Sequence, residues 1–224
     1  HNIHFLWDSA TMEGRSREAI DAARKSASRI PADAWREVPL LHQFLVAPLF
    51  AYTRFGEWET ILSEPRPPAD SPFWTGVWHY ARGLAFTAKN KLNQANRELD
   101  ELRNIAAQKS LDGYRVTFSR NGAGAILEIG VEVLSGEIAA RLGDYDQAIA
   151  RLHRAVLLED NLIYNEPPDW HVPVRQTLGA VLLAADRPAE AEAIYWQDLS
   201  RNRENGWSLF GLLQSLKAPD TPAA

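Results

Sequence analysis

The sequence contains no cysteine, and this absence excludes several classes of protein. Without a thiol the chain forms no disulfide framework, holds no thiolate metal site or iron–sulfur cluster, and uses no cysteine nucleophile. The same absence leaves the redox compartment open, so a cytoplasmic and a periplasmic location are both compatible with the composition. Methionine is scarce too, because Met12 is the only one and residue 1 is His1. We therefore expect a processed product or the C-terminal part of a longer protein.

Long apolar runs and a basic surplus are also missing. The longest apolar candidate, residues 39–52, is interrupted by His42, Gln43 and Pro48 and falls short of the roughly 18 residues that a membrane span needs. Lysine and arginine number 24 against 29 acidic residues, a net charge of −5, and the basic residues are scattered among the acids. The sequence therefore predicts a soluble protein and disfavours a membrane or a nucleic acid as its main partner.

Few segments have the residue pattern of a β-strand, whereas one short sequence motif, called the phrase below, recurs along the chain. It consists of a helical run, a turn residue, and an Ala or Ile five positions later. Its instances are Gly14/Ala19, Gly56/Ile61, Asn90/Ala95, Gly143/Ala148 and Asp186/Ala191. Each instance lies between two stretches with apolar residues at helical spacing, and this pattern indicates a helix–turn–helix unit. We therefore predict an all-α protein.

The phrase divides the chain into about five antiparallel helix pairs and one terminal helix. The predicted pairs cover residues 2–13/16–29, 38–54/57–64, 72–88/92–108, 123–142/145–158 and 170–185/188–202, and the last helix covers 206–217. A chain of 224 residues is long enough for one large domain or one continuous array. We expect a single helical-repeat domain over residues 1–218 and a disordered tail at 219–224.

The unit resembles the tetratricopeptide repeat, in which an Ala follows a Gly by twelve residues and an aromatic residue comes four later. Gly83, Gly136 and Gly179 each precede an Ala by twelve residues, and Tyr195 stands in the aromatic place of the last unit. Residues 207–211 read W-S-L-F-G, like the W-x2-L-G opening of that repeat. The units are spaced by 42, 34, 53 and 43 residues, where the family has about 34.

This resemblance implies a right-handed superhelical array of antiparallel helix pairs, an α-solenoid. The phrases F-W-x-G-x-W-H-Y-A-R-G at Phe73 and Y-x-E-P-P-D-W at Tyr164 resemble a group of bacterial tetratricopeptide-repeat proteins. That likeness implies a bacterial source and a repeat fold, and it implies no particular reaction.

In such an array the first helix of each pair lines a concave groove, where a peptide or a protein segment binds. Two stretches offer this groove aromatic and cationic side chains that suit a peptide or a carboxylate. The predicted ligand-binding residues are Trp78, His79, Arg82, Trp170, Arg175 and Gln176. We predict a scaffold that binds a protein or peptide, with no catalytic residues and no cofactor, and favour a non-enzymatic role.

Histidines and glutamates on the same inward helices support an alternative interpretation. Neutral imidazole and carboxylate groups are ligands for divalent metals such as zinc or copper. The candidate ligands are His4, His79, Glu128, Glu132 and Glu166. No H-E-x-x-H motif accompanies them. The alternative is therefore kept general: a metal-binding or small-molecule site, with or without enzymatic activity. A purely structural role within a larger chain is a third alternative.

Two connections, residues 109–124 and 159–170, are longer than is usual in a compact helical array. In the second, Pro167 and Pro168 fix the backbone, and we expect Asp169 to cap a helix that begins at residue 170. The terminal helix has no second helix to complete its pair, so its free face predicts a contact in a homodimer.

Overall fold

The structure is a computed structural model that describes residues 1–218, and these residues form helices and no strand. The α-helices are α1 (Asn2–Met12), α2 (Ser16–Ser28), α3 (Ala34–Glu37), α4 (His42–Phe55), α5 (Trp58–Ser63), α6 (Pro72–Ala88), α7 (Leu92–Ala106), α8 (Ala123–Arg141), α9 (Tyr145–Asp160), α10 (Val174–Ala184), α11 (Pro188–Arg201) and α12 (Gly206–Lys217). Two 3₁₀ turns, η1 (Pro39–Leu41) and η2 (Lys109–Leu111), complete the described elements. The predicted all-α class is confirmed, and the predicted tail lies outside the described residues.

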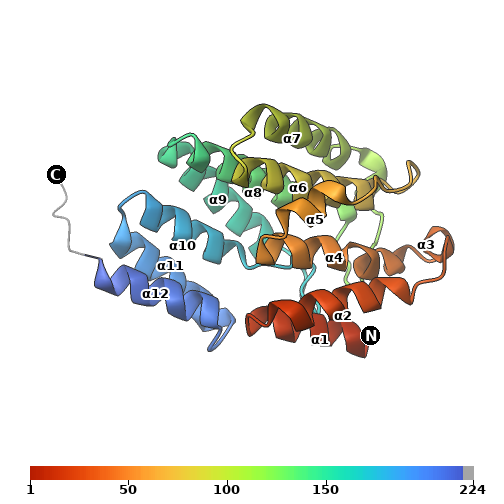
Figure 1. Ribbon diagram of the computed structural model, residues 1–224, viewed down its shortest axis with the longest axis horizontal. Coiled ribbons are helices and arrows are strands. Elements are labelled where there is room, and N and C mark those ends of the chain that lie inside the picture. Colours follow the sequence, from red (N-terminus) through yellow and green to blue (C-terminus); the bar gives the residue numbers. More distant parts are fainter. Residues whose placement is uncertain (219–224) are drawn as a thin grey trace.

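Consecutive helices form pairs that stack in chain order (Figure 1). The pairs are α1/α2, α4/α5, α6/α7, α8/α9 and α10/α11, and α12 packs on α10 and α11. Each pair also contacts the next pair along the chain, and this arrangement is consistent with an α-solenoid. The right-handed superhelix of the tetratricopeptide array stays a prediction. Within the described part of the chain, none of the helices combines the length and the apolar character that crossing a bilayer requires.

The recurring phrase of the sequence forms the turn of every pair. Each predicted turn residue adopts the left-handed backbone conformation, with φ between 56° and 81° at Gly14, Gly56, Asn90, Gly143 and Asp186. The residue five positions later is fully buried in every instance, at Ala19, Ile61, Ala95, Ala148 and Ala191. A left-handed residue ends the first helix, and the buried residue packs the second helix against the core. The prediction of five helix pairs is confirmed.

Two predicted helix starts are wrong, and proline explains both. The predicted helix at residue 38 begins as α4 only at His42, after the short helix α3 and the turn η1, which the sequence did not predict. The predicted helix at residue 170 begins only at Val174. Pro39 and Pro173 disfavour helical backbone in the residue before them, and this delays both helices.

Asp169 does not cap a helix, contrary to the prediction. Its carboxylate accepts hydrogen bonds from the Ser119 hydroxyl and from the side-chain amides of Asn121 and Asn165, both at 2.7 Å. Ser119 and Asn121 belong to the connection between α7 and α8, whereas Asp169 precedes α10. The two long connections are therefore tied together by a buried carboxylate.

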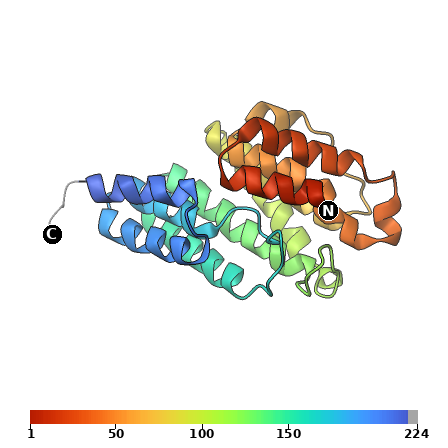
Figure 2. The ribbon, with the colours of Figure 1, turned by 90° about the horizontal axis from the view of Figure 1, so that it is seen from below.

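The last helix returns to the first pairs. The Trp207 indole N–H donates to the carbonyl of Thr11, at 3.0 Å, and the Arg54 guanidinium lies 3.7 Å from the centre of the Trp207 ring. Figure 2 shows the N-terminal pairs at the right and α10 to α12 at the left, with the near ends of α1 and α12 facing each other. The contact joins residues 196 positions apart in the sequence.

The Tyr195 ring packs between a glycine of α10 and a glycine of α12. A Cβ atom added to Gly179 of α10 would lie 2.5 Å from the Tyr195 ring, and one added to Gly211 of α12 would lie 2.1 Å from it. Both glycines therefore allow their helices to approach α11 more closely than any residue with a side chain could.

We expect Gly179→Ala to lower the free energy of unfolding by about 1–3 kcal/mol, because the confined Tyr195 ring has no room to move away from the added methyl group. Gly206→Ala is the matched control, since it is also a helical position and nothing lies within 4 Å of its added Cβ. Urea denaturation followed by circular dichroism measures both. Equal stabilities of the two variants would contradict the close packing at Tyr195.

Candidate functional site

The first helices of four successive pairs line one cavity. Side chains of α4, α6, α8 and α10 surround a space of about 850 Å3, and the connection before α10 adds Trp170 and His171 to its wall. This volume lies within the range of ligand pockets. We call this space the inner groove.

Glu137 of α8 places an unpaired carboxylate in the inner groove. No hydrogen bond or ion pair reaches this carboxylate from any residue in 1–218. Arg141, whose charge acts on this carboxyl group, donates instead to the carbonyls of Thr87 at 3.1 Å and Ala88 at 2.6 Å. Burial raises the pKa of Glu137, and the charge of Arg141 offsets part of this rise.

Arg54 of α4 places a guanidinium without a carboxylate partner in the same groove. One of its terminal nitrogens donates to the side-chain oxygen of Gln176 at 2.6 Å, and its face stacks on Trp207. Its Nε is buried and has no hydrogen-bond partner. Burial lowers the pKa of Arg54 to about 10, an effect that the charge of Asp198 partly offsets.

Tyr80 of α6 lies within the electrostatic reach of both groups. Burial raises the pKa of its phenol well above the usual range, Glu137 raises this pKa further, and Arg54 lowers it. The phenol is therefore neutral at physiological pH. Glu137 and Arg54 form no ion pair with each other, so the inner groove contains a carboxyl group and a guanidinium group that do not pair.

His171, in the wall of the groove, has one ring nitrogen without a hydrogen-bond partner in residues 1–218. The Thr53 hydroxyl donates to the Phe50 carbonyl at 2.8 Å, so the hydroxyl must accept from Nε2–H of His171, 3.2 Å away. Nδ1 of His171 is then unprotonated, and this buried atom has no partner. Burial lowers the pKa of the imidazole well below its usual value, and the charge of Arg54 adds to this effect. The ring is therefore a neutral hydrogen-bond acceptor.

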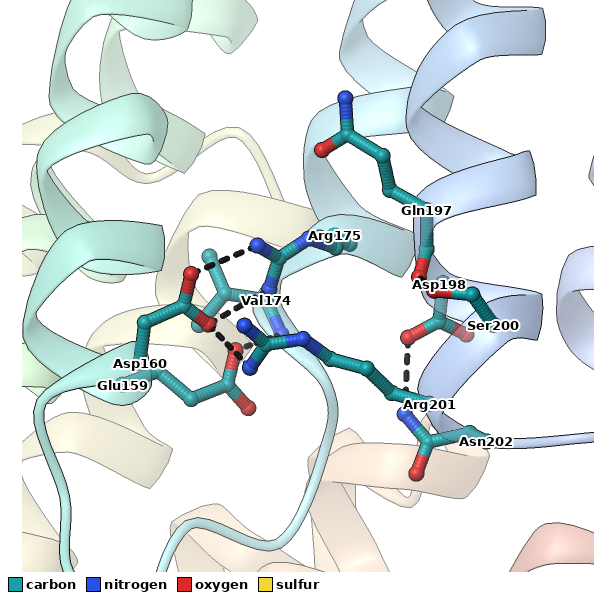
Figure 3. A network of polar contacts seen from close by, with 9 residues as sticks. All are labelled: Glu159, Asp160, Val174, Arg175, Gln197, Asp198, Ser200, Arg201 and Asn202. Carbon is teal, nitrogen blue, oxygen red and sulfur yellow. Dashed lines mark hydrogen bonds and ion pairs between the residues drawn. The ribbon is translucent and has the colours of Figure 1, made fainter.

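A second cavity, of about 730 Å3, shares Trp170 and His171 with the inner groove. It lies among α1, α9, α10, α11 and residues 162–173, and we call it the outer cavity. Asp160 at the end of α9 accepts two hydrogen bonds from Arg175, at 2.8 and 2.7 Å, and one from Arg201 at 2.6 Å (Figure 3). One carboxylate thus faces two guanidinium groups and holds both in place.

Two other carboxylates of the outer cavity titrate near neutral pH. Burial raises the pKa of Glu159 to about 7, although its carboxylate accepts the Val174 backbone N–H at 3.0 Å. Burial and the charge of Glu166 raise the pKa of Asp8 to about 6. Carboxyl groups with such values in a cavity are typical of functional sites.

Three of the predicted ligand-binding residues bind one another instead of facing either cavity. Glu98 of α7 accepts hydrogen bonds from Nδ1 of His79 at 2.6 Å and from Nε of Arg82 at 2.9 Å. Arg82 stacks on Trp78 at 4.4 Å, and the indole N–H of Trp78 donates to the Glu64 carbonyl at 3.2 Å. This cluster joins α6 to α7 and to the end of α5.

The other three predicted residues lie near the cavities, but they form no pocket with the first three. Trp170 lines both cavities, and Arg175 lines the outer one. Gln176 connects Arg54 to Asp198. Its side-chain oxygen accepts a hydrogen bond from Arg54, and its side-chain N–H donates to the Asp198 carboxylate at 3.2 Å. The single aromatic and cationic pocket predicted from the sequence is therefore divided between two places.

The rotation of α6 explains the division. Tyr80, Leu84 and Thr87 follow one another at four and three residues and line the inner groove. Each step along a helix turns by about 100°, so His79 faces α7 although it is the neighbour of Tyr80. Sequence reasoning missed Arg54, Tyr80 and Glu137. The only signals for the last two were the W-H-Y-A-R-G phrase and the position of Glu137 directly after a repeat glycine.

The five residues considered as metal ligands contact other side chains of the protein, and Glu128 and Glu132 share Arg154 as a partner. The contacting side chains are Trp7 for His4, Glu98 for His79, Arg154 for Glu128, Arg151 and Arg154 for Glu132, and Tyr164 for Glu166. Between residues 1 and 218, no three His, Asp or Glu side chains come together in an arrangement that could hold a metal ion. The set proposed for zinc or copper is therefore not assembled.

Comparison of the chain with protein-family models, curated proteins and solved structures finds no match. The resemblance to the tetratricopeptide repeat thus depends on the sequence offsets alone, and membership of that family and a bacterial source stay predictions.

Replacement of Glu159 by Gln tests the buried carboxylate of the outer cavity. The folded protein holds the Glu159 proton up to about pH 7, whereas the unfolded chain releases it near its ordinary pKa of 4.5. Wild type therefore gains stability from this group as the pH falls from 8 to 5, and Glu159→Gln does not. We expect the stability difference between them to change by about 2 kcal/mol over this range in favour of wild type. Parallel pH profiles of urea denaturation would mean that the carboxylate is solvated.

Proposed function

We propose that this chain is a binding protein that holds a peptide or a protein segment in the inner groove. The observation that carries the proposal is the presence of two unpaired charges, Arg54 and Glu137, in one cavity. A charge removed from water without a partner is costly to the folded protein. A ligand with one group that pairs with Arg54 and another that pairs with Glu137 would offset that cost. Its affinity would come from protein groups that have no partner in the free protein.

A peptide suits the remaining polar groups of the groove. Thr177 of α10 lines the groove, and its half-buried hydroxyl can accept a hydrogen bond from the backbone N–H that a peptide offers at every residue except proline. Trp58, Tyr145 and Trp170 add aromatic surface to the wall of the groove. Burial of apolar side chains against such rings supplies affinity without any catalytic group.

A second candidate function is a small-molecule or enzymatic site in the outer cavity. Asp8 and Glu159, with pKa values of about 6 and 7, favour it because carboxyl groups that titrate near neutral pH serve as general acids and bases. In this alternative the ligand would carry a positive charge, since Arg175 and Arg201 are already paired with Asp160.

The homodimer through the terminal helix also stays a proposal. Four apolar side chains of α12 are well exposed: Leu209, Phe210, Leu213 and Leu216. Such a stripe at helical spacing is typical of a helix face that packs against another surface.

Replacement of Ala180 by Trp should block the inner groove without disturbing the core, because Ala180 lies on the exposed surface of α10 that lines this space. We expect the affinity for captured peptides to fall at least roughly tenfold, an effect of steric exclusion. Synthetic arrays of random short peptides provide the ligands, and fluorescence polarisation of the captured sequences provides the affinities.

Ala189→Trp is the matched control, since Ala189 is equally exposed on α11 and lies outside both cavities. It should bind like wild type. Equal binding by Ala180→Trp and wild type would place the peptides elsewhere on the molecule, and capture of no peptide at all would contradict the proposed function.

A further inference from the structure

The inner groove has an electrical polarity that the proposed function does not by itself require. Glu137 on α8 and Arg54 on α4 carry opposite charges, line the same space and do not pair with each other. Both act on the phenol of Tyr80 on α6, which stands between these helices in the stacking order. A ligand that fits both ends must itself be dipolar.

We infer, building on the proposed function, that the segment bound in the inner groove carries a cationic side chain that pairs with Glu137 and a carboxylate that pairs with Arg54. The cation is the ammonium of lysine or the guanidinium of arginine. The carboxylate is a chain terminus or an acidic side chain one or two residues away. The inner groove is thus a site for a short dipolar peptide stretch.

The environment of Glu137 is suited to a cation from outside the protein. Arg141, the cation whose charge acts on this carboxyl group, donates to the carbonyls of Thr87 and Ala88 at the end of α6. The carboxylate of Glu137 therefore keeps all its acceptor positions for a ligand. Trp58 and Tyr145, which are half-buried in the same wall, offer aromatic surface for the methylene chain of a lysine or an arginine.

The environment of Arg54 is suited to a carboxylate. Trp207 and Gln176 hold the guanidinium in one position, and neither of them neutralises its charge. One of its terminal nitrogens donates to Gln176, and the other donates to no residue in 1–218. A guanidinium fixed in place with a free donor binds a planar carboxylate through parallel hydrogen bonds.

The test is the charge preference of the captured peptides, measured separately for each half of the site. The probes are short peptides with a free C-terminal lysine, their C-terminal amides, and versions in which norleucine replaces lysine. Wild type should bind the free lysine peptide roughly tenfold or more tightly than either altered version, as expected for hydrogen bonds to charged groups.

Glu137→Gln is the decisive variant, because the wild-type carboxylate forms no hydrogen bond or ion pair with residues 1–218 that the substitution could break. It should bind the lysine and norleucine peptides equally and should still prefer the free carboxylate to the amide. Arg54→Met should show the reverse pattern. Since Arg54 also stacks on Trp207, Arg54→Lys serves as a second variant that keeps the charge and loses the forked geometry. Glu128→Gln, on the same helix as Glu137 and outside the groove, should leave both preferences intact.

Two failures remain distinguishable. In the first case, wild type captures peptides and Ala180→Trp abolishes their binding, but Glu137→Gln leaves the lysine preference unchanged. This result overturns the dipolar ligand and leaves the peptide-binding groove supported. If Ala180→Trp has no effect on the captured peptides, the groove itself is overturned. Wild-type binding without any charge preference would also overturn the inference.

Discussion

The left-handed residue between the two helices of each pair is the constraint on which the rest of the structure depends. It ends the first helix within one residue, and the fully buried residue five positions later then packs the second helix against the core. Only glycine, or a residue such as Asn90 or Asp186 that tolerates this conformation, can occupy the turn. Because the same geometry occurs five times, the first helices of successive pairs stack beside one another. The inner groove is a product of this repetition.

Part of the chemistry of the groove comes from places where the repetition is broken. Arg54 stands near the end of α4 and is oriented by Trp207 of the unpaired terminal helix, while His171 belongs to the long connection before α10. That connection is fixed by Asp169, whose carboxylate binds the connection before α8. The regular part of the fold therefore builds a space, and the irregular parts supply much of its chemistry.

Local features were predictable from the sequence, and the assembled site was not. The turns at Gly14, Gly56 and Gly143 depend on backbone conformation and on residues a few positions away. Such local determinants can be recognised in a short stretch of sequence. Which side of α6 faces the groove depends on how the helix is rotated against its neighbours. A difference of one position separates Tyr80, which lines the groove, from His79, which binds Glu98 on α7. The Arg54 guanidinium is held in position by stacking on the Trp207 ring, and no local sequence pattern predicts a contact between residues so far apart in the chain.

The hydrogen bond from Trp207 to Thr11 has a consequence for the evolution and the cooperativity of such an array. In an open solenoid each unit contacts only its neighbours, so units can be gained or lost by duplication and can unfold piecemeal. Here an inserted or deleted helix pair would move Trp207 away from both Thr11 and Arg54. The number of helix pairs between α1 and α12 is therefore fixed by the contact between these two helices, and the unfolding of one is thermodynamically coupled to the unfolding of the other.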